Sequence, residues 1–322
     1  MRTRWILTAT AVTSLLPVRG AFGQQHMNPV VDLLSASKPV FGLYAPANPR
    51  TRPGQPAADP STLKSPAQLA KDALANTRVD YIFDGSMEGN FDAGFAGFQD
   101  FAKGMVDGGM LQGKRQSHPL FVKTPGIAED PAKAKERIAR QLDLGVSGIV
   151  LVDVESADEV KLGLAAMRFK SKGGTRPDHV GEAAKRWGLS EKDYKEKADV
   201  WPLNPKGELV NFTIVESKAG LAKIREIAAV KGIGVLFPGA GTLRGVFTDT
   251  DASGQRKFNE AAWEAAIQQV LAACKEFKVA CGYPAGEADI AMRMKQGFSV
   301  FVIGWGESGF KAVDIGRNVG GR

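Results

Sequence analysis

The side chains that could do chemistry stand directly after short apolar runs of the sequence. Acidic segments at 84–88 and 153–155 begin at the ends of two of these runs, Lys123 ends a third, and Glu216 directly follows a fourth. If the runs are parallel strands, their carboxyl ends meet at one rim, where active sites of such folds lie. Carboxylate oxygens suit Mg²⁺ or Mn²⁺, and a lysine can neutralise a small organic acid.

Eight apolar runs alternate with helical patterns, and this alternation predicts an α/β fold. Near-continuous Val, Ile and Phe runs are typical of parallel strands that helices cover on the outside. Eight such units favour a (β/α)8 TIM barrel over a doubly wound sheet, because residues 44–49 after the first run carry no glycine-rich phosphate turn. The runs span residues 40–45, 81–84, 120–123, 148–154, 212–215, 234–237, 279–283 and 299–304.

Capping residues delimit the helices between these runs. Asp130 and Pro131 predict a helix start, and Gly145 predicts the end of that helix. Ser156 and Glu159 form a capping box at the start of the next helix.

Residues 171–209 form a long loop after strand four, much longer than an ordinary connection. A loop that leaves the carboxyl end of a barrel strand rises beside the active site. We therefore expect a lid or a subunit contact, with a passive insertion as the alternative.

Composition excludes several classes of protein. The 322 residues are 43% hydrophobic and 24% charged, which is typical of a folded globular chain. No apolar run reaches the roughly 18 residues of a membrane span.

Cys274 stands on an apolar helical stripe and Cys281 in the seventh run, so both are predicted to be core thiols rather than a disulfide or a nucleophile.

The N-terminus predicts export. Arg2 and Arg4 precede an apolar stretch, and small residues at 21 and 23 provide a cleavage site, which indicates a signal peptide over residues 1–23. The mature chain, 24–322, is then a single barrel domain, periplasmic or secreted. Cleavage removes three of the positive charges behind the net charge of +7, and the rest are interleaved with acids. A nucleic-acid partner or a membrane partner is therefore not expected.

Several ordered motifs together resemble the HpcH/HpaI aldolase and citrate lyase β-subunit family. Residues 145–159 best match the family's "D-x-G-x-x-G-I-x-x-P-x-V-x-S-A-x-E" run, and the motifs 215–217, 226–228, 232–235 and 239–243 follow in order. The resemblance spans about residues 36–317. It implies a barrel of the phosphoenolpyruvate/pyruvate type and a metal-dependent enzyme that makes or breaks C–C bonds through a pyruvate-type enolate.

The resemblance assigns metal and substrate positions. The family's metal-binding Glu falls on Glu216, and its second metal ligand, an Asp, falls on Thr242. The turn holding Gly239 and Gly241 is implied to bind the substrate carboxylate together with Thr242. Lys123 stands where the family has a substrate-binding Arg, so it keeps the charge without the bidentate fork.

The implied proton-transfer residues are only partly kept. The family's His falls on Gly89, while Glu88 keeps the preceding acid, and the Asp that supports the His falls on Asp143. We expect Lys123, Asp143 and Glu88 to be the catalytic residues.

Two hypotheses follow from this pattern. The first is a carbon–carbon lyase of the aldolase type that acts on a 2-oxo or 2-hydroxy acid with Mg²⁺ or Mn²⁺. Metal binding is expected to be weak, because the second ligand position is Thr242. The alternative is a diverged member that binds a small carboxylic acid without turnover. The resemblance also implies a homo-oligomer.

Overall fold

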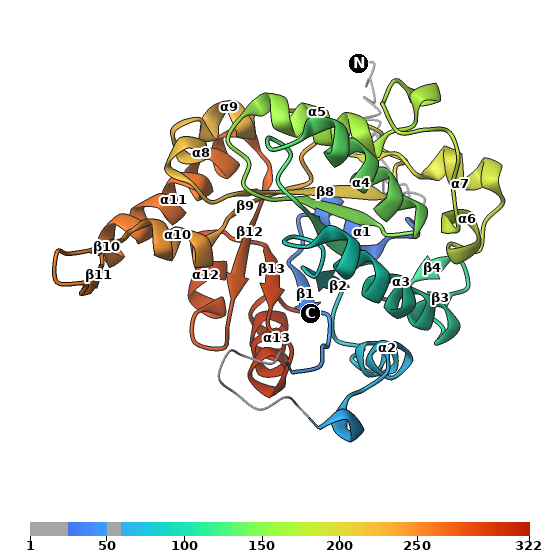
Figure 1. The fold of residues 1–322 in the computed structure, drawn as a ribbon, viewed down its shortest axis with the longest axis horizontal. Coiled ribbons are helices and arrows are strands. Elements are labelled where there is room, and N and C mark those ends of the chain that lie inside the picture. The colour runs from blue at the N-terminus through green and yellow to red at the C-terminus, as the bar shows by residue number, and fades with distance from the viewer. Residues whose placement is uncertain (1–24, 50–58) are drawn as a thin grey trace, which may run out of the picture.

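Eight parallel strands close into a barrel in the computed structural model, which describes residues 25–49 and 59–322 (Figure 1). The predicted signal peptide lies outside the described residues. The strand order is β6-β5-β2-β1-β13-β12-β9-β8, and a pairing of β6 with β8 closes the ring. Each of the eight predicted runs overlaps one strand, which confirms the TIM barrel. The strands are β1 (Val40–Tyr44), β2 (Tyr81–Asp84), β5 (Leu120–Thr124), β6 (Gly148–Leu151), β8 (Leu209–Val215), β9 (Val235–Pro238), β12 (Ala280–Ala285) and β13 (Val300–Ile303).

Helices surround the barrel, as Figure 1 shows. The outer layer contains α2 (Pro66–Ala75), α3 (Phe91–Asp107), α4 (Pro131–Asp143), α5 (Ala157–Met167), α8 (Lys218–Ala222), α9 (Ile224–Ala228), α10 (Ala240–Val246), α11 (Glu260–Phe277), α12 (Ile290–Gln296) and α13 (Glu307–Val319). Two small hairpins, which the sequence did not predict, are β3 (Leu111–Gln112) with β4 (Arg115–Gln116) and β10 (Thr248–Thr250) with β11 (Arg256–Phe258). No helix of the described chain is long and apolar enough to cross a membrane.

Aromatic side chains fill the barrel interior. Tyr81 and Phe121 have ring centroids 4.9 Å apart, and Phe212 lies 4.6 Å from Phe121. Gly42 makes room for this layer, because a Cβ there would collide with the Tyr81 ring. The helix α1 (Pro29–Ser35) adds Val30 to the same apolar cluster and thereby covers the amino-terminal end of the barrel.

The predicted caps are confirmed. The Asp130 side chain accepts the Lys133 N–H at 3.0 Å at the start of α4, and Gly145 follows the helix with φ +80°. The Ser156 hydroxyl accepts the Glu159 N–H at 3.3 Å. Local sequence therefore fixes where α4 and α5 begin and where α4 ends.

The long connection lies at the opposite end of the barrel from the one predicted. It leaves α5 rather than β6 itself, and α5 has already returned the chain to the amino-terminal end of the strands. The short strand β7 (Val200–Trp201) accordingly pairs with the first residues of β8, Leu209 and Val210. The expectation of an active-site lid is wrong. The connection carries α6 (Ala183–Arg186) and α7 (Glu191–Lys197).

A disulfide joins Cys274 of α11 to Cys281 of β12, so the prediction of two free thiols is wrong. Both residues are buried, as their apolar surroundings indicated. The turn from α11 into β12 folds the chain back on itself and places the two Cα atoms 5.6 Å apart, within the range of a disulfide. The helix and strand positions, taken separately, did not reveal this juxtaposition.

Candidate active site

Lys123 and Glu88 form the central ion pair of the carboxyl-terminal rim. The Lys123 Nζ atom lies 2.8 Å from each carboxylate oxygen of Glu88. Lys123 is the second-last residue of β5, whereas Glu88 stands in the loop after β2. Gly85 lies between them, because a Cβ built there would stand 3.6 Å from Lys123 Cδ and 4.0 Å from Glu88 Oε2. The structure thus brings together two of the three predicted catalytic residues.

Lys123 is held firmly and stays charged. Its side chain is 13% exposed, against 38% for Glu88. The Gln141 side chain of α4 donates to the Lys123 carbonyl at 2.8 Å and fixes the backbone beneath it. Burial acts against the positive charge, but the hydrogen bond and negative charge of Glu88 outweigh burial, and the pKa of Lys123 is raised. Lys123 therefore offers a permanent cation to an organic anion.

Glu216 and Asp153 form a second acidic pair on neighbouring strand ends. Glu216 follows β8 and is 5% exposed, and its Oε1 accepts the Asp153 backbone N–H at 3.2 Å. Asp153 has φ +51°, a left-handed conformation that is uncommon outside glycine. Burial, and then the negative charges of Glu216 and Glu88, raise the pKa of the Asp153 carboxyl. A cation between these acids would relieve their mutual repulsion.

Gly239 and the turn after β9 lie against the same acids. A Cβ at Gly239 would collide with the Glu216 side chain, so only glycine lets the turn approach. Gly241 and Thr242 lie in the first turn of α10 and are exposed, and Gly241 has open space around its Cα. Gly89 likewise is exposed with open space beside it. The positions of the family's second acid and His thus stand at the open surface of the rim.

Tyr44, which the sequence analysis did not single out, also belongs to the rim. It ends β1, is 38% exposed, and its ring packs edge-on against Phe83 at 4.9 Å. Burial, together with the negative charges of Glu88 and Glu216, raises the pKa of the Tyr44 phenol against the opposing effect of Lys123. The strand-end rule that found Lys123 also applies to Tyr44, since both are the last polar groups of their runs.

Asp143 does not join this group. It is the last residue of α4, a helix that runs away from the rim. Its carboxylate accepts a hydrogen bond from Arg176 at 2.9 Å and lies 3.1 Å from His179 Nδ1. Both partners belong to the connection between α5 and β8. Asp143 therefore lies apart from the other two predicted catalytic residues, Lys123 and Glu88, and helps to attach that connection to the barrel.

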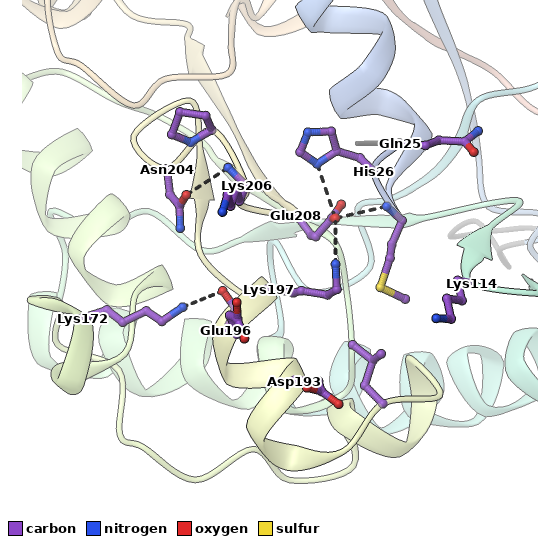
Figure 2. A pocket seen from close by; sticks show the side chains of 13 residues that line it. Gln25, His26, Lys114, Lys172, Asp193, Glu196, Lys197, Asn204, Lys206 and Glu208 are labelled. Atoms are coloured by element: carbon purple, nitrogen blue, oxygen red, sulfur yellow. Dashed lines mark hydrogen bonds and ion pairs between the residues drawn. The ribbon is translucent and has the colours of Figure 1, made fainter. Parts of the chain in front are cut away.

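A cleft of about 880 Å³ lies at the amino-terminal end of the barrel (Figure 2). We call it the basal cleft. Glu208, 2% exposed, accepts the backbone N–H groups of Met27 and Asn28 at 3.1 and 3.0 Å, and lies 3.4 Å from His26. This acid is thus engaged by backbone and does not offer a reactive carboxylate. The lining residues are Gln25, His26, Met27, Lys114, Lys172, Leu189, Asp193, Glu196, Lys197, Asn204, Pro205, Lys206 and Glu208.

A closed parallel barrel that gathers acids and a lysine at its carboxyl-terminal rim belongs to the TIM-barrel class, whose enzymes carry their active sites at this rim. A model of the HpcH/HpaI aldolase/citrate lyase family matches residues 119–307, more than half of the chain. The chain belongs to this family. A 2-dehydro-3,6-dideoxy-6-sulfogluconate aldolase of Pseudomonas putida is 32% identical over 120 residues, which are 37% of this chain and 42% of that protein. The chain thus matches less than half of the length of this curated relative.

Solved structures of the same family share the fold. A family protein from Burkholderia cenocepacia has a TM-score of 0.62 at 20% identity, over 86% of this chain and 92% of that chain. The Mycobacterium tuberculosis citrate lyase β subunit, complexed with oxaloacetate and magnesium, has a TM-score of 0.50 at 15% identity, over 89% of this chain and 98% of that chain. At these low sequence identities, the similarity shows a shared fold and nothing further.

Proposed function

We propose that the protein is a carbon–carbon lyase of the aldolase type that cleaves a small 2-oxo acid carrying a hydroxyl group. The observation that carries the proposal is the meeting of a charged Lys123 with the acids Glu88, Glu216 and Asp153 at one rim. Family membership supports a lyase, and the relatives include an aldolase and a protein complexed with oxaloacetate. The chemistry of the rim suits a carboxylate-bearing substrate.

A divalent cation fits the donor set, and Mg²⁺ is bound in the related citrate lyase subunit. Oxygen donors predominate at the rim, where the carboxylates of Glu216 and Asp153 repel each other. We propose that these two carboxylates would hold Mg²⁺ or Mn²⁺, with Asp153 in the role that the family gives to the residue at Thr242. Among the described residues no cluster of three metal-binding side chains occurs. Substrate oxygens must therefore complete the site, and binding without substrate is weak.

Each rim residue has a separate role in the cleavage reaction. Lys123 binds the substrate carboxylate and sets the orientation of the 2-oxo group. The buried Glu216 lies beside this group, where the bound metal ion would polarise the oxo oxygen and stabilise the charge that develops on it. The C3–C4 bond then breaks, its electron pair remains on C3, and the aldehyde half leaves as the C4 hydroxyl loses its proton. A rim acid must accept that proton.

The test measures pyruvate release from a panel of 4-hydroxy-2-oxo acids. Lactate dehydrogenase reduces the released pyruvate, and the accompanying oxidation of NADH is recorded. Turnover should require added Mn²⁺ or Mg²⁺, and Glu216→Gln should abolish it together with metal-dependent pyruvate binding. Binding of pyruvate without turnover of any panel member would instead support the diverged binder. If the protein neither binds pyruvate nor cleaves any panel member, the proposal is wrong.

We also propose that the chain is exported and assembles as a homo-oligomer. The basic and apolar start of the sequence supports export, as does the disulfide between Cys274 and Cys281, since disulfides persist mainly in oxidising compartments. Protein from the native host should have the intact mass of residues 24–322. Light scattering after gel filtration measures the assembly, and a monomeric species would contradict it.

A further inference from the structure

Glu88 is paired with Lys123, the cation that the proposed function assigns to binding the substrate carboxylate. Both of its carboxylate oxygens lie 2.8 Å from Lys123 Nζ, so they engage two of the three ammonium protons of Lys123. Among the described residues Lys123 has no second ion pair. A substrate carboxylate that accepts two protons of Lys123 must therefore compete with Glu88.

Of the two partners, Glu88 is the one free to move. Lys123 lies on a barrel strand, is 13% exposed and has its carbonyl bound by Gln141. Glu88 lies in the loop between β2 and α3, and its side chain is 38% exposed. Gly85 and Gly89 in the same loop add no side chain that would obstruct a rotation of Glu88.

Three of the other rim acids are held by donors that a substrate does not displace, and the proposed function assigns Asp153 to the metal ion. Glu216 accepts the Asp153 N–H, and Asp84 accepts both the N–H and the hydroxyl of Ser86 at 2.8 and 2.5 Å. Glu155 accepts the Ser217 hydroxyl at 2.5 Å. Glu88 thus differs from them, because its partner is the group that the substrate itself engages.

We propose that Glu88 is a base that the substrate sets free, an inference that rests on the proposed lyase function. The substrate carboxylate takes the place of Glu88 at Lys123, and the released Glu88 carboxylate accepts the proton of the C4 hydroxyl. The O–H electron pair becomes the second bond of the aldehyde, and the C3–C4 pair becomes the enolate. Glu88 then returns its proton to C3, which yields the 2-oxo acid without any further reactant.

This arrangement makes Glu88 act in opposite directions on binding and on turnover. In the free protein its negative charge competes with the substrate carboxylate and weakens binding. In the complex the same carboxylate is the base, and loss of a general base typically lowers the rate by about 10²–10⁴-fold. If Glu88 merely positioned Lys123, it would instead strengthen substrate binding, and its loss would weaken binding.

The experiment compares the parent, Glu88→Gln and the control Glu129→Gln by calorimetric titration with pyruvate and by pyruvate release, at one fixed Mn²⁺ concentration. Glu129 is an exposed acid near Asp153 after β5, so its loss removes the same charge from the same rim. Glu88→Gln should bind pyruvate about three- to tenfold more tightly, as expected when a competing ion pair is lost, while kcat falls about 10²–10⁴-fold. Glu129→Gln should change neither value more than about twofold.

Unchanged or weaker pyruvate binding by Glu88→Gln, or turnover at the parent's rate, overturns the inference while the parent's activity upholds the proposed function. If the parent neither binds pyruvate nor cleaves any panel member, both fail together. Thermal melting of each variant checks the fold, and the exposure of Glu88 makes an effect on folding small.

Discussion

The two ends of the barrel each hold a carboxylate next to a positively charged side chain, but they hold it differently. In the basal cleft, Glu208 lies beside His26 and Lys197 (Figure 2). It is 2% exposed and accepts two backbone N–H groups. At the rim, Glu88 is 38% exposed and both its oxygens engage Lys123. The first carboxylate is fixed by groups that cannot leave, whereas the second is held by a group that a ligand can take over.

This difference separates a structural acid from a functional one. A buried carboxylate satisfied by backbone joins segments distant in sequence, here residue 208 and residues 27–28, and its removal leaves donors without partners. An acid paired with a single side chain at an open rim can exchange partners at little cost. Charge alone does not distinguish the two acids, whereas burial and the identity of the hydrogen-bond donors do.

The largest expected effect is the loss of Lys123. Lys123→Met should lower kcat/KM for a 4-hydroxy-2-oxo acid by about 10²–10³-fold, because the substrate carboxylate then has no cation to bind at the rim. Steady-state kinetics of pyruvate release measures the change. Lys123→Arg is the matched control, since it keeps the charge and should retain most of the activity. Equal losses in both variants would mean that shape rather than charge matters at this position.

The second prediction concerns the basal cleft. Glu208→Ala should lower the free energy of unfolding by about 3 kcal/mol, because two backbone N–H groups lose their acceptor and Lys197 and His26 lose their counter-ion. Urea denaturation measures it. The exposed acid Glu196 lines the same cleft, and Glu196→Ala should change stability by less than about 0.5 kcal/mol. A rise in KM or a fall in kcat in Glu208→Ala with unchanged stability would reverse the roles of the two ends.

The fold was predictable because its signals are local. The apolar runs, the cap at Asp130 and the turn at Gly145 depend on residues close together in sequence, and each appears in the structure where the sequence put it. The rim was predictable for a similar reason, because the end of a parallel strand in a barrel always faces the same side. This rule brought Lys123 and Glu216 to one rim, and it would also have found Tyr44.

What the sequence did not reveal depends on contacts between distant segments. Asp143 was assigned from the resemblance, but Arg176, 33 residues later, takes its carboxylate. The long connection was placed by its order after strand four, although the intervening α5 carries it to the other end. The Lys123–Glu88 pair spans 35 residues, and neither residue has a neighbour in sequence that indicates the other.

The third prediction sharpens the account of the rim acids. Thr242 stands where the family has a metal-binding Asp, so Thr242→Asp should tighten Mn²⁺ binding about tenfold by adding an anionic ligand. Calorimetric titration with Mn²⁺, with and without pyruvate, measures it. Thr242→Asn adds a side chain of the same size without the charge and should leave the affinity near that of the parent. If both variants bind alike, the position does not reach the ion.

The smallest expected effect is a pH dependence from the basal cleft. The interaction with the Glu208 carboxylate, 3.4 Å from His26 Nδ1, is the largest of the effects that raise the pKa of His26 above its ordinary value of 6.5. A histidine whose pKa is higher in the folded than in the unfolded protein stabilises the fold in full below pH 6.5, and this contribution is lost as the pH rises through the folded pKa. Unfolding free energy should thus fall between pH 6 and pH 8 by less than about 1 kcal/mol, the range of ordinary ion pairs.

The matched variant is His26→Gln, which keeps a polar side chain without the titration. Urea denaturation of both proteins at intervals across this pH range separates the His26 contribution from all other titrating groups, because those are common to the two chains. His118 provides a check of sign, since burial lowers its pKa and its contribution therefore runs in the opposite direction with pH. Parallel stability curves for the parent and His26→Gln would show that the histidine adds nothing to the fixed end of the barrel, and that Glu208 is held by its two backbone donors and Lys197.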